Sequence, residues 1–191
     1  KYYGIGFQLI SQPIQLIIKN LIFIFQDVDI YGAHLIAKHF VVFLSFFISG
    51  IFFYLIISKI SNNKIFSIFA VILYLSYPYL LGHAFFNPKD IPFLCFWIIC
   101  TYCSFNIFDK LLNDIYPNYG EIILFSILNA LLLSTRLTGI LIFIQYIITF
   151  AIFINFHKLD WKSFFRSIFK KILLFIFLLL FFVYLFYPVF W

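Results

Sequence analysis

Charged side chains are scarce in this sequence. They make up 10% of its 191 residues, whereas hydrophobic residues make up 65%, and the mean hydropathy is +1.09. A soluble domain averages about 25% charged and about 45–50% apolar residues. The deficit in charge therefore excludes a soluble globular domain and predicts an integral membrane protein, with the lipid bilayer, and no nucleic acid, among its partners.

Methionine is absent and cysteine is rare. Without an initiator methionine, we expect the sequence to be an internal piece of a longer protein. The cysteines are Cys95, Cys100 and Cys103, and all three fall in one apolar run. Cys100 and Cys103 have CxxC spacing, but without a second pair or a nearby histidine this spacing is a weak indication of zinc. We interpret the cysteines as small buried hydrophobic residues and predict no metal site on them.

The apolar residues are gathered in runs of the length that spans a membrane, which is about 20 residues. Backbone groups in lipid must be satisfied within their own segment, and the runs lack the two-residue alternation of membrane strands, so we expect helices. The predicted fold class is an all-α polytopic membrane bundle over residues 39–191, with about six spanning helices. The runs cover residues 40–58, 65–82, 91–108, 121–135, 137–156 and 171–187.

Lysine and arginine in the connections predict the orientation of the bundle. Loops 58–64, 109–120 and 157–171 together hold eight of these residues, whereas the loops on the other side hold Lys89 and Arg136. Basic residues accumulate in cytoplasmic loops. We therefore expect a multi-pass protein of the inner cell membrane, with Lys89 and Arg136 together on the extracytoplasmic face.

Residues 1–38 contain no run of spanning length. The stretch 13–25 is apolar but short, and Lys19 interrupts it. Pro13 suits the start of a helix. We expect an extracytoplasmic segment whose helix lies in the membrane interface, followed by entry into the membrane near His39. A re-entrant hairpin is the alternative.

Polar residues concentrate in the stretch GHAFFNPKDIPF, residues 82–93, between two of the apolar runs. Asn87 and Asp90 each precede a proline in the manner of a helix start, so Asp90 has an alternative role as a helix N-cap. A cap does not explain Lys89, because a cation opposes the positive end of a helix unless an anion sits there. His83 is either an interfacial histidine or a catalytic base. Together these residues indicate a phosphate site involving Asn87 and Lys89.

Arg136 is the second unusual polar residue, because it lies in the apolar stretch LLLSTRLTGILIF. An arginine at membrane depth is costly and marks a ligand or pairing site, although a snorkelling surface cation is the alternative. The sequence has eleven lysines and two arginines, so a guanidinium here favours bidentate binding of phosphate or carboxylate. The run 121–135 is short, and we expect it to leave Arg136 recessed in protein.

Asp27 and Asp29 are either solvated loop residues or a carboxylate pair.

Three stretches of the sequence together resemble one known family. YGAHLIAKHFVVFL (31–44), LYLSYPYLLGHAFFNPKDIPFL (73–94) and NALLLSTRLTGILIF (129–143) are similar to segments of bacterial members of glycosyltransferase family 39. These are polytopic GT-C enzymes related to the protein O-mannosyltransferases and to the aminoarabinose transferase that acts on lipid A. KYYG at residues 1–4 is similar to a tract in the family's first extracytoplasmic loop. The resemblance spans residues 1–145, and Asn-Pro-Lys-Asp-Ile-Pro is its most specific element.

The resemblance implies transfer of a hexose or pentose from a polyprenyl-phosphate carrier to a lipid, glycan or protein acceptor at the extracytoplasmic face. The leaving group is an anionic lipid phosphate, and Lys89 and Arg136 supply cations that offset its growing charge. Asp90 either positions Lys89 or helps to bind a divalent cation. His83 would orient the acceptor or the phosphate.

Two departures from the family concern the completeness of the site. Lys38 stands before His39 where the family usually has arginine, and we expect both residues to contribute to phosphate binding. The family's general base is an acidic residue in the first extracytoplasmic loop, and we expect it upstream of Lys1. The sequence is therefore expected to hold only part of the site.

Two other functional classes stay open. In a polytopic anion transporter or channel, Lys89 and Arg136 would line the path; inverted repeats would support that reading, and no convincing repeat is present in the sequence. In a non-catalytic membrane scaffold, all the charges would lie at interfaces. The sequence does not indicate the sugar or the acceptor, and it leaves open a divalent cation as cofactor.

Overall fold

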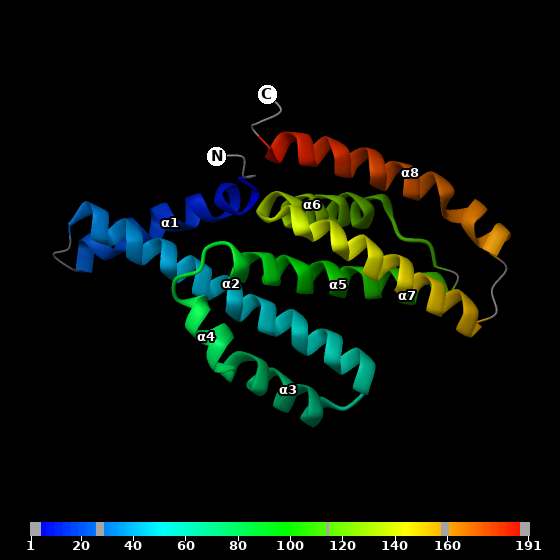
Figure 1. The fold of residues 1–191 in the computed structure, drawn as a ribbon, viewed down its shortest axis with the longest axis horizontal. Helices are drawn as coiled ribbons and strands as arrows, with labels where there is room; N and C mark the ends of the chain where they lie inside the picture. Colours follow the sequence, from blue (N-terminus) through cyan, green and yellow to red (C-terminus); the bar gives the residue numbers. More distant parts are fainter. Residues whose placement is uncertain (1–4, 26–28, 114, 158–160, 188–191) are drawn as a thin grey trace. The chain divides into compact units, whose positions relative to one another are not determined.

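The computed structural model describes residues 5–25, 29–113, 115–157 and 161–187, and every regular element in these ranges is helical. The predicted all-α architecture is confirmed for this part of the chain. The elements are α1 (Gly6–Phe25), α2 (Ile30–Ser61), α3 (Lys64–Ser76), α4 (Pro78–Ala84), α5 (Asp90–Leu112), α6 (Tyr119–Thr135), the 3₁₀ helix η1 (Leu137–Ile140), α7 (Leu141–His157) and α8 (Trp161–Phe186) (Figure 1).

Several of these helices are long and apolar enough to cross a membrane. Among the described residues four of them, α1, α2, α5 and α8, meet this condition singly, and the bent pair α3 and α4 meets it together. Helices α6 and α7 are apolar but shorter. These helices are those of a multi-pass membrane protein, and the number of six spans stays a prediction.

Helix α1 differs from the short interfacial helix that the sequence predicts. It begins at Gly6 and has 20 residues, so Pro13 lies inside the helix rather than at its start. Helix α2 begins at Ile30, before His39, where the sequence predicts entry into the membrane. A proline removes one backbone hydrogen bond, and α1 continues past that loss. The N-terminal segment therefore holds a helix that is itself long enough to span a membrane.

Short polar caps stand at the helix starts. The side chains of Asp29, Asn63 and Asn118 each accept a hydrogen bond from the backbone N–H three residues further on. The Glu121 side chain also accepts from the Asn118 N–H, which completes a capping box at α6. Asp29 is thus a helix cap, whereas Asp27 lies outside the described residues.

The predicted span over residues 65–82 is not one continuous helix, although its two parts together are long and apolar enough to cross a membrane. Helix α3 ends at Ser76 and α4 begins at Pro78, with a 61° bend between them. Pro78 lacks an N–H and pushes the residue before it out of the helical region. Tyr77 accordingly has φ −61° and ψ 115°. This break sends the chain into the polar stretch 82–93 at an angle to α3.

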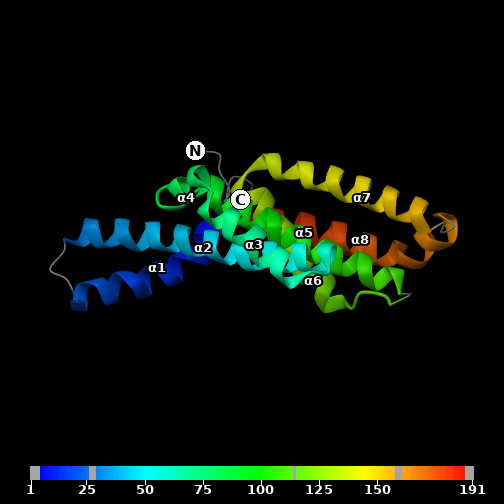
Figure 2. The ribbon, with the colours of Figure 1, turned by 90° about the horizontal axis from the view of Figure 1, so that it is seen from below.

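The chain divides into two compact units, and the first comprises Ile5–Ile99. In it, α1 lies beside α2, and α2 beside α3 (Figures 1 and 2). Small residues allow the second pair to approach closely: a Cβ added to Gly50 would lie 2.9 Å from the Leu75 side chain. The Ser49 and Tyr74 hydroxyls are 2.7 Å apart and join the same two helices. Close backbone approach with interhelical hydrogen bonds is typical of helices in lipid.

The second unit begins at Cys100, and buried polar side chains join its helices. Asn129 of α6 is fully buried. Its side chain accepts from the Tyr146 hydroxyl of α7 at 3.1 Å and donates to the Phe125 carbonyl at 2.8 Å. The Tyr187 hydroxyl, just after α8, donates to the Leu133 carbonyl of α6 at 3.1 Å. Helices α6, α7 and α8 are thus joined by polar contacts that lipid cannot replace.

Candidate functional site

Asn87 is the centre of a hydrogen-bond network at the start of α5. Its side-chain oxygen accepts from the backbone N–H groups of Lys89, at 3.2 Å, and Asp90, at 3.0 Å. These two donors fix which side-chain atom is the oxygen, so the Nδ2 amide group faces away from them. Nδ2 lies 2.9 Å from Asp90 Oδ2 and 3.0 Å from Nδ1 of His83. The three side chains therefore form one connected network.

The network holds the neutral His83 ring in one tautomer. The Asn87 Nδ2 group only donates, so Nδ1 of His83 accepts and the ring proton lies on Nε2. Nε2 then offers an N–H donor and no lone pair. The ring also packs against Tyr79 and Phe86, with centroid distances of 4.4 and 5.1 Å. This arrangement favours His83 as a donor to an anion over His83 as a base.

The hydrogen bonds assign the helix cap to Asn87 rather than to Asp90. Asp90 is the first residue of α5, and its carboxylate accepts from the Asn87 amide group. Lys89 immediately precedes the helix, and its side chain is exposed. Because the backbone amides of both residues already donate to Asn87, these two amides are not the donors for an anion at this helix end.

A buried apolar cluster holds the polar stretch against α2. Ala84 and Ile91, on either side of the network, pack with Val42 of α2. Phe85 stacks on Phe43 with a centroid distance of 5.1 Å. The apolar residues of the polar stretch are thus packed against α2, and this packing holds the hydrogen-bond network beside that helix.

Lys38 and His39 lie on this same part of α2. They come one helical turn before Val42 and Phe43, so they share the face that packs against the polar stretch. Both side chains are half-buried. The first unit therefore contains six of the predicted site residues, namely Lys38, His39, His83, Asn87, Lys89 and Asp90.

Arg136 lies in the turn between α6 and η1. Its backbone N–H donates to the Leu132 carbonyl at 3.2 Å, and its own carbonyl accepts from the Gly139 N–H at 2.9 Å. Helix α6 ends one residue earlier, and the side chain of Arg136 is exposed in the turn, which differs from the expected recessed position. Arg136 belongs to the unit that begins at Cys100, so a phosphate site shared with Lys89 stays a prediction.

Metal-ligating side chains are not clustered in the part of the chain that the structure describes. No group of three or more His, Cys, Asp and Glu residues there is placed to hold a metal ion. The cysteines are free thiols; Cys95 and Cys100 are buried and Cys103 is half-buried. Burial of the first two confirms their interpretation as packed apolar residues.

Residues 1–4, which carry the KYYG resemblance, lie outside the described residues.

The bridging role of Asn87 is absent from the sequence prediction, which gave this residue a helix start and phosphate binding. The signal was present in the spacing. His83 precedes Asn87 by four residues and Asp90 follows it by three, and these separations bring side chains together on a helical turn. Pro88 predicts a loop between Ala84 and Asp90, so helical spacing does not suggest itself for these residues in the sequence.

Comparison of the chain with protein-family models, with curated proteins and with solved structures finds no match. The candidate site therefore rests on its own geometry, in which a tautomer-fixed His83 and an exposed Lys89 are held by Asn87 at the start of a membrane-length helix.

Proposed function

We propose that the chain is part of a membrane glycosyltransferase of the GT-C type, which moves a sugar from a polyprenyl-phosphate carrier to an acceptor at the extracytoplasmic face. The observation that carries this proposal is the network of His83, Asn87 and Asp90 beside Lys89. Donors and a cation gathered at the end of a membrane-length helix suit a phosphate attached to a lipid. The sequence resemblance to family 39 supports the same reaction.

The chemistry needs groups that stabilise a leaving phosphate. The acceptor hydroxyl oxygen bonds to the anomeric carbon while the bond from that carbon to the phosphate oxygen breaks, and negative charge grows on the phosphate. The Lys89 ammonium and the Nε2–H of His83 offset that charge where it develops. The proton of the acceptor hydroxyl passes to a general base, which the resemblance expects upstream of Lys1.

Asn87 and Asp90 act on this step through other residues. Asn87 fixes the His83 tautomer and binds the backbone amide of Lys89. Asp90 accepts from the other side of the Asn87 amide group and so keeps its orientation. Supporting hydrogen bonds of this kind, made to residues that themselves contact the substrate, hold reacting groups within the narrow geometry that catalysis requires.

Turnover of a radiolabelled polyprenyl-phosphate sugar by the full-length protein tests the proposal. We expect Lys89→Ala to lose activity by about 100-fold, the usual loss for one donor to a developing oxyanion. Lys64→Ala is the matched control, because Lys64 is exposed at the start of α3 in the same unit, and it should keep wild-type turnover. Wild-type activity in Lys89→Ala would reduce residues 82–93 to a surface loop.

An anion-uptake assay in liposomes separates the transferase from the transporter alternative. We expect liposomes that contain the full-length protein to take up labelled phosphate no faster than empty ones. Uptake that depends on Lys89 and Arg136, without sugar transfer, would contradict the proposal and favour a transporter.

A further inference from the structure

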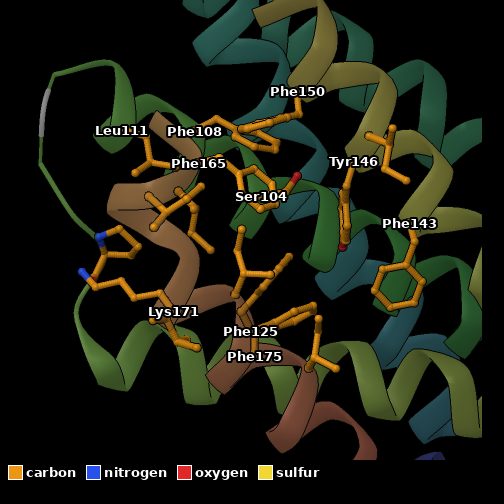
Figure 3. A pocket seen from close by; sticks show the side chains of 17 residues that line it. Ser104, Phe108, Leu111, Phe125, Phe143, Tyr146, Phe150, Phe165, Lys171 and Phe175 are labelled. Atoms are coloured by element: carbon orange, nitrogen blue, oxygen red, sulfur yellow. The ribbon is translucent and has the colours of Figure 1, made fainter. Parts of the chain in front are cut away.

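The second unit contains an apolar cavity of about 450 Å³, which α5, α6, α7 and α8 line. Figure 3 shows aromatic side chains from these helices around one space, with Lys171 at its edge. Phe108, Phe125, Phe150 and Phe175 are among the lining residues. The volume is in the range of about 300–1,000 Å³ typical of ligand pockets, and the lining suits an unbranched apolar chain.

Lys171 is the one charged side chain among the described residues that line this cavity. Its ammonium donates to the Pro117 carbonyl at 2.7 Å and lies 5.0 Å from the centre of the Tyr116 ring. An ammonium has three N–H donors, and the carbonyl takes one of them. A cation held in this way at the edge of an apolar cavity matches a ligand with an anionic head and an apolar tail.

Lys110, Glu121 and Lys171 interact with one another near this end of the cavity. Lys110 forms a salt bridge with Glu121. The hydrogen bond from Lys110 holds the pKa of the Glu121 carboxyl below its usual value, with a smaller contribution from the charge of Lys171. Lys110 and Lys171 thus both act on the Glu121 carboxylate, and these three groups together carry one excess positive charge that attracts an anion.

The position of Lys171 along α8 matches the level of lipid headgroups. The candidate span of α8 runs from Ile168 to Phe186, so Lys171 is near its first turn, and Phe175 lies one turn deeper along the same face. The cavity therefore extends from headgroup level into the hydrocarbon layer. Its α5 residues, Ser104 to Leu111, come from the C-terminal part of that helix.

We propose that this cavity binds one acyl chain of an anionic phospholipid, whose phosphate contacts Lys171. An acyl chain gains little by leaving the bilayer for an equally apolar cavity, so selectivity comes from the headgroup. The positive-inside pattern of the loops places this site in the cytoplasmic leaflet. The site is independent of the sugar-transfer site and does not rest on the proposed reaction.

Native mass spectrometry of the full-length protein, equilibrated with equal amounts of phosphatidylglycerol and phosphatidylcholine, tests this proposal. We expect the wild type to retain phosphatidylglycerol, and Lys171→Gln to retain about fivefold less, equivalent to roughly 1 kcal/mol for one cation at a membrane surface. Lys170→Gln is the matched control, because Lys170 is exposed and does not line the cavity.

Equal loss in the two variants, equal retention of both lipids by the wild type, or preferential retention of a polyprenyl phosphate would overturn the proposal. If Lys171→Gln fails to fold, the wild type still gives an answer. Phosphatidylglycerol with a photoactivatable acyl chain should crosslink to peptides that contain Phe108, Phe150 and Phe175. Crosslinks that favour the exposed Phe40 and Phe47 of α2 would show ordinary surrounding lipid instead and contradict the site.

Discussion

Polar side chains serve different ends in the two units of this chain. In the first, His83, Asn87 and Asp90 bond to one another within eight residues of sequence and organise a break between helices. In the second, Asn129 and Tyr146 bond across 17 residues and join two helices. The local network does not use Nε2 of His83, whereas the long-range contact pairs the side-chain oxygen of the fully buried Asn129 with the Tyr146 hydroxyl. The first arrangement thus organises polar groups beside one another at a helix start, and the second holds two helices together.

The largest expected effect breaks the local network at its centre. Asn87→Ala removes two hydrogen bonds to backbone N–H groups and both side-chain hydrogen bonds. His83 is then no longer held in one tautomer, and the backbone at Lys89 is no longer held in place. If the proposed function holds, we expect the full-length protein to lose transferase turnover about 100-fold, and about 1 kcal/mol of unfolding free energy in any case.

Asn63→Ala is the matched control for that prediction. Asn63 caps α3 through the Phe66 N–H in the same unit, so its removal should cost a similar free energy and leave turnover intact. Equal turnover in the two variants would mean that Asn87 is a helix cap and nothing more.

A smaller loss of activity is expected from Arg136→Lys, because a point charge does not replace the bidentate fork of a guanidinium. We expect turnover to fall about tenfold, equivalent to about 1.4 kcal/mol, and Arg136→Ala to weaken binding of the lipid phosphate further. Full activity in both variants would confine the site to the first unit and leave Arg136 as a surface cation.

Packing rather than activity should respond to Gly139→Ala. A Cβ at Gly139 would lie 3.2 Å from the Leu132 carbonyl oxygen, and that backbone atom has little freedom to move. We expect a loss of about 1–3 kcal/mol, the usual cost of overpacking, measured by denaturant unfolding in detergent. Gly82→Ala is the matched variant, because a Cβ there meets nothing within 4 Å. It should stabilise the protein by about 0.5–1 kcal/mol through its helix propensity, and equal effects of the two substitutions would contradict the close approach.

The smallest effect concerns Glu121. Its pKa is lowered from the usual 4.5, first by the hydrogen bond from Lys110. Because the folded pKa lies below the unfolded value, the stabilisation is complete above pH 4.5 and is lost as the pH falls through the folded pKa. We expect wild type to have a slightly larger unfolding free energy than Glu121→Gln. This difference should be constant from about pH 7 to about pH 5 and shrink below that, as measured by denaturant unfolding of both proteins at each pH. An advantage that grows on acidification would contradict the ion pair.

The sequence alone predicts the membrane character, the helices and most of the connections. Long apolar runs in lipid have few backbone solutions besides helices, and polar loops of Asn, Asp and Gly mark their ends. It also singles out residues 82–93, since charge in so apolar a chain is conspicuous. The bend at Tyr77 was readable from Pro78, but the hydropathy of residues 65–82 is continuous and concealed it. In α1, Pro13 by its propensity indicates a helix start, because propensity alone does not show that a helix tolerates one missing hydrogen bond.

Tertiary structure decides what those polar residues do. Whether Asn87 caps a helix, bridges His83 to Asp90, or binds a ligand depends on which atoms lie within about 3 Å of its amide, and composition does not contain that distance. The cavity beside Lys171 is likewise invisible in the sequence, because its phenylalanines have the same hydropathy as those that face lipid. Hydropathy is a property of each residue and places the helices in the membrane. Tautomers, caps and cavities are properties of pairs of atoms, and only the packed helices bring those pairs together.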